Sequence, residues 1–300
     1  MKRSIKLFLI VIMLSSCNTS QFTFTENDEG ILLSEKDHPV FFYQKIPKSR
    51  TGEYICNNYL HPLYDLKGDT LTEEFPDDHL FHRGVFWAWH QLFAGSRNLG
   101  DGWMNQGITY DVTSAETSAD GDSAILKTTV IWKSDSLKDG SFIRENSTMT
   151  VQRHKENYRT IDFAITLNPL IDSLQMGGSD DEKGYGGFCI RMKMPADLTF
   201  NSGNGAVKPQ NLQITAGNWM DFNADFAGKG HKTGIILVSH PSNPGPGTWI
   251  LRQTGSMQNA VFPGRQKIMI EHPLTLRYRI IIYEGERPAI EYLTNHPGRY

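Results

Sequence analysis

Apolar and polar residues alternate along several separate segments of the chain. Around residue 161, the apolar residues Ile161, Phe163 and Ile165 share one parity, and polar or small residues hold the other. A period of two is the pattern of a half-buried β-strand, whose successive side chains point to opposite faces. The same pattern recurs at residues 124–133, 142–153, 234–239 and 276–283. We therefore expect a β-strand in each of these segments.

Turn-forming residues separate the predicted strands, and helical patterns are almost absent. Glycine, aspartate, asparagine, serine and proline gather at residues 117–122, 135–140, 201–205 and 241–247. The one helix that the pattern favours is short, near residues 287–293, where Pro288 takes an early position that tolerates proline. Many strands, frequent turns and almost no helix are typical of all-β proteins. We predict a large antiparallel β-sandwich, with a single domain over residues 38–300.

The first residues have the pattern of a secretory signal. Basic residues precede an apolar run at residues 7–14 that is too short to span a bilayer, and small residues then lead into Cys17. This ending resembles the lipobox of bacterial lipoproteins, which implies cleavage before Cys17 and a lipid on its thiol. We expect residues 1–16 to be a signal peptide and residues 17–37 a flexible tether. The mature chain would be a lipid-anchored protein of the cell envelope, and Asn18 favours the outer membrane.

Charge and cysteine content narrow the classes of partner and cofactor. The chain has 30 Lys and Arg against 33 Asp and Glu, a formal net charge of −3, with no long run of one sign. This balance does not indicate a nucleic-acid partner. The glycine-rich loops lack the Walker spacing, so we expect no nucleotide cofactor. Cys56 and Cys189 stand in apolar, strand-like settings and are interpreted as buried thiols, with a disulfide as the alternative.

Ionisable side chains are densest at residues 77–90, which hold three of the ten histidines. Histidine titrates near neutral pH, so histidines beside carboxylates indicate proton transfer, metal ligation or a polar binding pocket. His79 and His82 stand three residues apart in the loop that enters a predicted strand, with Asp78 beside them. We predict that these two histidines act as acid, base or metal ligand, and that Arg83 orients the ligand. The alternative is that the histidines serve turn and capping hydrogen bonds.

The strand that follows is predicted to run from His82 to Gln91. At about 3.3 Å per residue, a straight strand would place His82 and His90 roughly 26 Å apart. We therefore expect that His82 and His90 do not hold one metal ion together. A divalent metal on His79 and His82 would need a further ligand, such as Asp78 or His240.

Three further groups of residues are candidates for the site. Glu182 and Lys183, in an acidic glycine-rich loop, can supply an acid and a charge that binds substrate, although a solvated loop is the alternative. His240 and Asn243 lie where a strand ends in a proline-rich loop, a common place for functional residues. Trp103 and Trp249 can stack on sugar rings, with core packing as the alternative.

These motifs together resemble the PmoA-like family, a family without an established function. The resemblance covers most of the mature chain. It also makes plausible a similarity to large β-sandwiches of the sugar-mutarotase type, in which histidines and carboxylates on one sheet face act on sugars. The resemblance to the PmoA-like family rests on residues 59–65, 76–84, the glycine-rich loop before Phe188 and Arg191, and residues 240–244.

Three hypotheses about function follow from these observations. The first is a carbohydrate-processing envelope enzyme, of hydrolase, lyase or epimerase type, that uses the histidine-rich junction. The second is a glycan-binding lipoprotein without catalysis. The third is metal-dependent chemistry at the same histidines. A convergence of His79, His82, His240 and Glu182 on one concave face would favour an active site.

Overall fold

The protein, described here by a computed structural model over residues 21–245 and 247–290, is built from β-strands arranged in three antiparallel sheets. None of the described residues forms a helix long and apolar enough to cross a membrane. The predicted signal peptide and Cys17 lie outside the described residues, and the predicted helix at residues 287–293 extends beyond them. The all-β fold class and the large antiparallel β-sandwich are confirmed.

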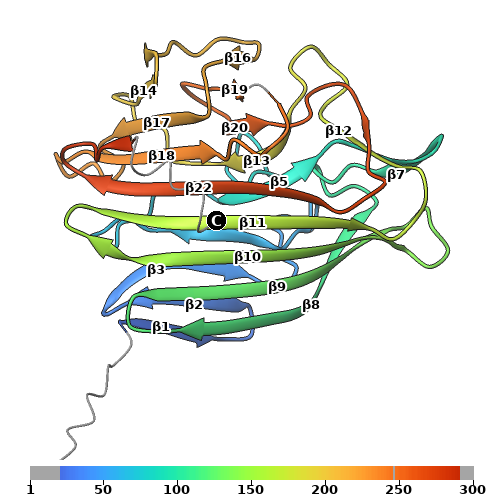
Figure 1. The fold of residues 1–300 in the computed structure, drawn as a ribbon, viewed down its shortest axis with the longest axis horizontal. Helices are drawn as coiled ribbons and strands as arrows, with labels where there is room; N and C mark the ends of the chain where they lie inside the picture. Colours follow the sequence, from blue (N-terminus) through green and yellow to red (C-terminus); the bar gives the residue numbers. More distant parts are fainter. Residues whose placement is uncertain (1–20, 246, 291–300) are drawn as a thin grey trace, which may run out of the picture.

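Two nine-stranded sheets form the layers of the sandwich, and a four-stranded sheet lies at one end (Figure 1). The first sheet has, in spatial order, β1 (Phe22–Glu26), β2 (Gly30–Glu35), β3 (His38–Gln44), β4 (Tyr59–Leu63), β5 (Val85–Trp89), β13 (Gly186–Ile190), β20 (Gln258–Val261), β19 (Thr248–Ile250) and β16 (Ile214–Thr215). The second has β15 (Gly205–Ala206), β14 (Thr199–Ser202), β17 (Trp219–Ala224), β18 (Thr233–Ser239), β22 (Leu274–Glu284), β11 (Tyr158–Pro169), β10 (Ser141–Lys155), β9 (Ser123–Ser134) and β8 (Ile108–Ala119). The small sheet has β21 (Ile268–Met269), β12 (Leu174–Gly177), β6 (Gln91–Ala94) and β7 (Arg97–Gly100).

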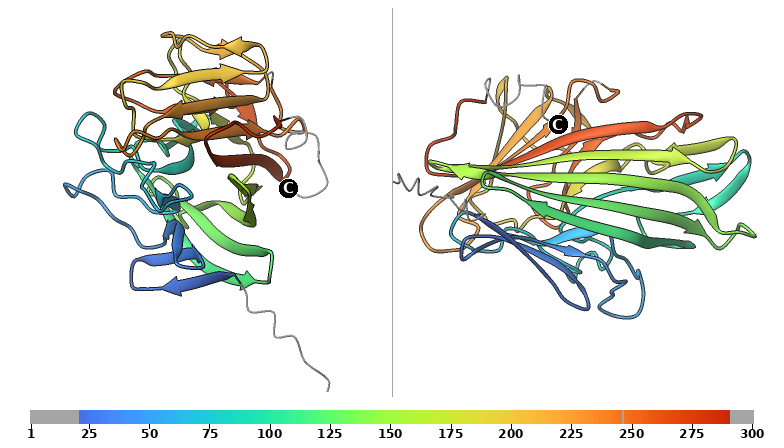
Figure 2. Two further views of the ribbon diagram at one scale, coloured as in Figure 1. Left: turned by 90° about the vertical axis from the view of Figure 1, so that its left-hand side faces the viewer. Right: turned by 60° about the horizontal axis from the view of Figure 1, so that its bottom comes forward.

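The long strands predicted from the alternating pattern are present in the second sheet. Strands β9, β10, β18 and β22 cover the segments predicted at residues 124–133, 142–153, 234–239 and 276–283. Strand β11 carries the apolar residues around position 161. These long strands lie side by side and fan out with the twist that is usual for β-sheets (Figure 2). The period of two therefore identified this layer correctly.

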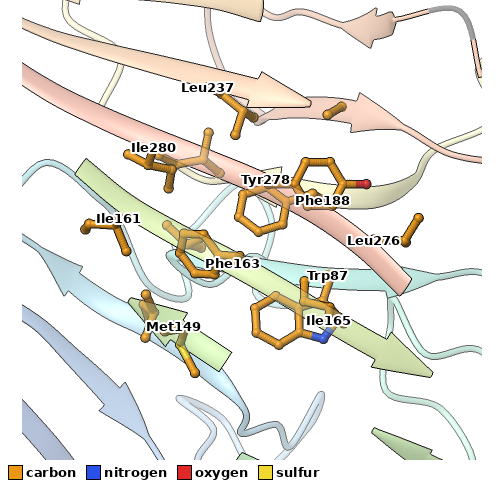
Figure 3. Close-up of a cluster of buried hydrophobic side chains, with 14 of the residues drawn as sticks. Trp87, Met149, Ile161, Phe163, Ile165, Phe188, Leu237, Leu276, Tyr278 and Ile280 are labelled. Carbon is orange, nitrogen blue, oxygen red and sulfur yellow. The ribbon is translucent and has the colours of Figure 1, made fainter. Parts of the chain in front are cut away.

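Aromatic side chains fill the space between the two large sheets. Trp87 of β5 packs edge-on against Phe163 of β11, with ring centroids 6.4 Å apart. Phe188 of β13 stacks on Tyr278 of β22 at 4.4 Å. Figure 3 shows these four side chains meeting with aliphatic residues from both layers. Burial of such large apolar surfaces is the main force that holds two sheets together.

A buried carboxylate also joins the two large sheets. Glu145 of β10 is fully buried and accepts hydrogen bonds from the indole N–H groups of Trp87 and Trp132, both at 2.9 Å. The Ser147 hydroxyl donates to it at 2.6 Å, and the Asn58 amide at 3.1 Å. Burial raises the pKa of Glu145 even though all four donors favour its charged form. The donors come from both layers. Trp87 lies in β5 of the first sheet and Asn58 directly precedes β4, whereas Trp132 and Ser147 lie in β9 and β10 of the second sheet.

The prediction of a tether at residues 17–37 is wrong from Phe22 onward, because β1 and β2 are strands of the first sheet. The reason is a long-range interaction. Glu35, at the end of β2, is buried, and its carboxylate accepts two hydrogen bonds from the Arg159 guanidinium, at 3.1 and 3.0 Å. It also binds the backbone N–H of His154 at 3.1 Å and the ring Nδ1 at 2.9 Å. These contacts attach β2 to the second sheet.

The contacts of Glu35 make the free energy of unfolding depend on pH. Burial raises the pKa of Glu35, but hydrogen bonds from His154 and the charge of Arg159 outweigh burial and hold this pKa below its ordinary value. The charged form therefore stabilises the fold fully above the unfolded pKa of about 4.3, and this stabilisation is lost as the pH falls through the folded pKa. We expect Glu35→Gln to unfold at a lower urea concentration near neutral pH, with a loss of about 1.5–3 kcal/mol.

The same variant should lose less additional stability than the unchanged protein between about pH 5 and pH 3. Urea titrations followed by tryptophan fluorescence measure both effects. Glu29→Gln, at an exposed neighbouring position, is the matched control and should behave as the unchanged protein does. Identical acid profiles for Glu35→Gln and the unchanged protein would contradict this role.

Candidate functional site

A break in the predicted strand creates the site. The backbone of Gly84 has a φ of +42°, and a Cβ at this position would lie 1.9 Å from the carbonyl oxygen of Leu60. Only glycine fits such a close approach. Strand β5 therefore begins at Val85, and the residues before Gly84 form turns in which the His79 N–H donates to the Pro76 carbonyl and the His82 N–H to that of His79.

These turns and two neighbouring loops enclose a pocket of about 180 Å³. It lies over a second apolar cluster that packs on the other face of β5 and includes Phe86 and Trp103. The lining contains three imidazoles, one ammonium group, two hydroxyls and three further aromatic rings. It consists of His79, Phe81, His82, His90, Trp103, Lys183, Tyr185 and Ser256.

His79 is oriented by a carboxylate. Its Nδ1 lies 2.9 Å from Asp78 Oδ2, so Nδ1 carries the proton and Nε2 is the basic nitrogen. Asp78 is itself held by two hydrogen bonds from the buried Arg191, at 3.0 and 2.9 Å. Burial raises the pKa of Asp78, but the hydrogen bonds from Arg191 and His79 outweigh it and lower this pKa to about 2. The carboxylate is therefore charged at neutral pH and keeps His79 in one tautomer.

His82 is held in the opposite tautomer. Its side chain is 2 % exposed, and its Nδ1 faces the Arg191 guanidinium at 3.4 Å. Because arginine only donates, Nδ1 must accept, and the proton of the neutral ring is on Nε2. Burial and the nearby positive charges lower the pKa of His82 to about 2. The His79 and His82 rings stack with centroids 4.4 Å apart and an interplanar angle of 3°.

The structure adds His90 to this pocket, which corrects the straight strand from His82 to Gln91. Because Gly84 ends the strand, His82 and His90 line the same pocket, although a straight strand would separate them widely. His90 Nδ1 lies 2.8 Å from Asp101 Oδ2, and its ring stacks on Trp103 at 5.0 Å. The three histidines of residues 77–90 indicate that His90 belongs to the site. The alternating pattern, however, predicts a straight strand that would place His90 far from His82.

Arg83 does not have the geometry that was predicted for it. The side chain is buried, and its Nη1 donates to the carbonyl oxygens of Phe81 at 3.0 Å and Trp103 at 3.3 Å. Its guanidinium lies 4.4 Å from the centre of the Phe86 ring. Arg83 is not among the residues that line the pocket, so it supports the loop from inside and does not face a ligand.

The glycine-rich loop contributes Lys183 and Tyr185, but not Glu182. Asp181 Oδ1 accepts the backbone N–H groups of Lys183 and Gly184, at 2.9 and 3.0 Å, which fixes the loop. Lys183 and Tyr185 then line the pocket, whereas Glu182 is exposed and is not part of the lining. The predicted acid at Glu182 therefore does not join the histidines.

Of the remaining predicted site residues, His240, Asn243 and Trp249 do not line the histidine pocket, and Trp103 lines it as a buried side chain. The Nδ1 of His240 accepts the Ser242 N–H at 3.0 Å in a turn after β18, and His240 does not line the histidine pocket. Asn243 donates to the Arg277 carbonyl at 2.6 Å and accepts the Arg277 N–H at 2.7 Å. Trp249 is fully buried and donates to the Gly217 carbonyl at 2.8 Å. Trp103 lines the pocket but is only 2 % exposed, so it is not an exposed platform.

The donor atoms of the predicted metal ligands do not form a cluster of three. Within residues 21–245 and 247–290, the group that brings three ligand atoms within 4.8 Å of one another is Asp65, Asp69 and His231. Asp69 is already neutralised by the Lys229 ammonium, at 2.6 Å. The predicted ligands His79 and His82 do not belong to this group.

A wider, open cleft of about 760 Å³ lies on the other side of the Asp78–Arg191 pair. Both residues of that pair line it, together with His61, Lys193 and the carboxylates Glu73 and Glu74. Arg191 also donates to Glu73 at 2.8 Å. The segment that carries His79 and His82 therefore stands between the smaller histidine pocket and a wider, charged cleft.

Comparison with known proteins assigns a family but no activity. No curated protein sequence matches the chain. Among solved structures, the chain is similar to the GH36 alpha-galactosidase AgaB from Geobacillus stearothermophilus, with 9 % identity and a TM-score of 0.29 over 90 % of this chain. The chain spans only 39 % of the length of that protein. A family described as being of unknown function, DUF6807, matches residues 31–293, and the chain therefore belongs to this family.

Proposed function

We propose that the chain is a carbohydrate-processing enzyme that transfers protons at a sugar ring, of lyase or epimerase type. The observation that carries this proposal is the pair of stacked imidazoles with opposite tautomers in one pocket. Asp78 leaves Nε2 of His79 as a base, and Arg191 leaves Nε2–H of His82 as a donor. A base beside a hydrogen-bond donor is an arrangement that can move a proton and stabilise the negative charge that develops.

In an elimination, His79 Nε2 takes a proton from a carbon beside a carbonyl or carboxyl group. The C–H electron pair forms a carbon–carbon double bond, and the bond to the leaving oxygen breaks. The His79 imidazolium that forms then gives this proton to the leaving oxygen, while the neutral His82 donates a hydrogen bond from Nε2–H to the negative charge that develops. In an epimerisation, no bond to oxygen breaks: the carbanion takes up a proton from water on its other face, and His79 releases its proton to the solvent.

The lining supports a sugar as the ligand and disfavours hydrolysis. Phe81 and Tyr185 offer aromatic faces, while Ser256 and the imidazoles can bind hydroxyl groups. The volume of about 180 Å³ is smaller than typical pockets for drug-sized ligands, so we infer that it accepts one ring. Most glycoside hydrolases use two carboxylates that flank the bond, and no carboxylate is among the lining residues.

We also infer that the enzyme works in the cell envelope. The signal-like start and the lipobox at Cys17 support attachment to a membrane through a lipid on that thiol, and Asn18 supports the outer membrane. In this location the substrate would be a glycan of the envelope or of the surroundings.

Incubation with a panel of oligosaccharides in D₂O, followed by mass spectrometry, tests the proposal. We expect products of elimination, or sugars that gain deuterium at one carbon. Products that have gained one water would instead identify a hydrolase. Retention of a sugar on a glycan column without any change in mass would contradict catalysis and support the alternative, a glycan-binding lipoprotein.

A further inference from the structure

The charges around the pocket are unevenly distributed. Its lining includes the Lys183 ammonium and three imidazoles, but no carboxylate. Two carboxylates outside the lining each bind one of its imidazoles: Asp78 lies 2.9 Å from His79, and Asp101 lies 2.8 Å from His90.

Both of these carboxylates are also compensated by other groups. Asp78 receives two hydrogen bonds from Arg191. Asp101 accepts the backbone N–H groups of Trp103 and Met104, both at 2.9 Å. The pocket thus presents donors and positive charge to a ligand.

Lys183 is the full positive charge in the lining. Within the described parts of the chain, no ion pair or hydrogen bond involves its ammonium group. Asp181, two residues away, uses its Oδ1 for the Ser179 hydroxyl and for the backbone N–H groups of Lys183 and Gly184. The Lys183 carbonyl accepts the Gln213 amide at 2.7 Å, so the backbone that carries the ammonium is fixed on both sides.

We propose that the pocket selects a sugar that carries a carboxylate, a uronate, and that Lys183 is the residue that binds this carboxylate. The inference rests on the proposed function and deepens it. A carboxylate on the ring acidifies the neighbouring C–H bond, and an ammonium group stabilises the negative charge that develops when His79 removes the proton. Lys183 thereby determines specificity, while His79 moves the proton and His82 donates a hydrogen bond.

Direct binding measurements test this inference without requiring turnover. Isothermal titration calorimetry of the full chain with galacturonate and glucuronate should give dissociation constants at least about tenfold lower than with galactose and glucose, the gain expected for a charged hydrogen bond. In Lys183→Met this preference should fall to less than about twofold. Lys138→Met, at an exposed loop position, is the matched control and should keep the preference.

The outcomes separate this inference from the proposed function. Equal binding of acidic and neutral sugars by the unchanged protein, or a preference that survives in Lys183→Met, overturns the assignment of Lys183. Equal affinity for sulfated sugars and uronates overturns the selection of a carboxylate. Selective uronate binding without any deuterium exchange or elimination would support the inference while contradicting catalysis. Turnover of neutral sugars alone would do the reverse.

Discussion

Replacing His79 by glutamine is expected to lower the turnover number by a factor of about 10²–10⁴, the usual contribution of a general base. The side chain of His79 is 33 % exposed, so glutamine fits without a cavity in the core. Its amide keeps a polar contact with Asp78 but cannot take up a proton. Steady-state rates on the substrate found in the oligosaccharide panel measure the effect, with urea titration to show that stability is retained.

His272→Gln is the matched control, because His272 is an exposed loop histidine that does not line the pocket. Its rate should equal that of the unchanged protein. Full turnover in His79→Gln would show that this imidazole is not the base. The stacked pair would then have a structural role.

Replacing Glu145 by alanine is expected to reduce the free energy of unfolding by about 3–5 kcal/mol or more. The change leaves the indole N–H groups of Trp87 and Trp132 buried without an acceptor, and each such group costs about 1–3 kcal/mol. The Asn58 and Ser147 donors lose the same partner. Chemical unfolding followed by tryptophan fluorescence measures the loss directly.

Glu116→Ala, at an exposed position of the long strand β8, is the control and should change stability by less than about 0.5 kcal/mol. If Glu145→Ala were as stable as this control, the carboxylate would not join the two layers. Because Glu145 does not line the histidine pocket, any change in activity should follow the fraction of folded protein.

The long strands of the second sheet could be predicted from local pattern, but most of the shorter strands of the other two sheets could not. Strands such as β10 and β11 have a clear period of two, and their positions were predicted closely. The segment that became β1 and β2 is short and mostly polar, so it was interpreted as a tether. Its place in the sheet depends on the contact of Glu35 with Arg159, residues far apart in the sequence.

The site was predicted only in part, because residues that are far apart in the sequence come together in it. His79 and His82 were found because they are close in the sequence, and the structure brings Lys183 to them. His90 was placed too far away, because a period of two does not reveal the positive φ of Gly84. His240 and Glu182 have residue types suited to catalysis, but spatial convergence is not encoded in residue type.

Strand β5 lies between the hydrophobic core and the histidine pocket. Trp87 points from it toward the core and Glu145, whereas Phe86 belongs to the cluster beneath the pocket, together with Trp103. The pocket and the core of the sandwich therefore share strand β5. On heating, inactivation should therefore coincide with melting of the whole domain, without an earlier loss of activity at an intact scaffold.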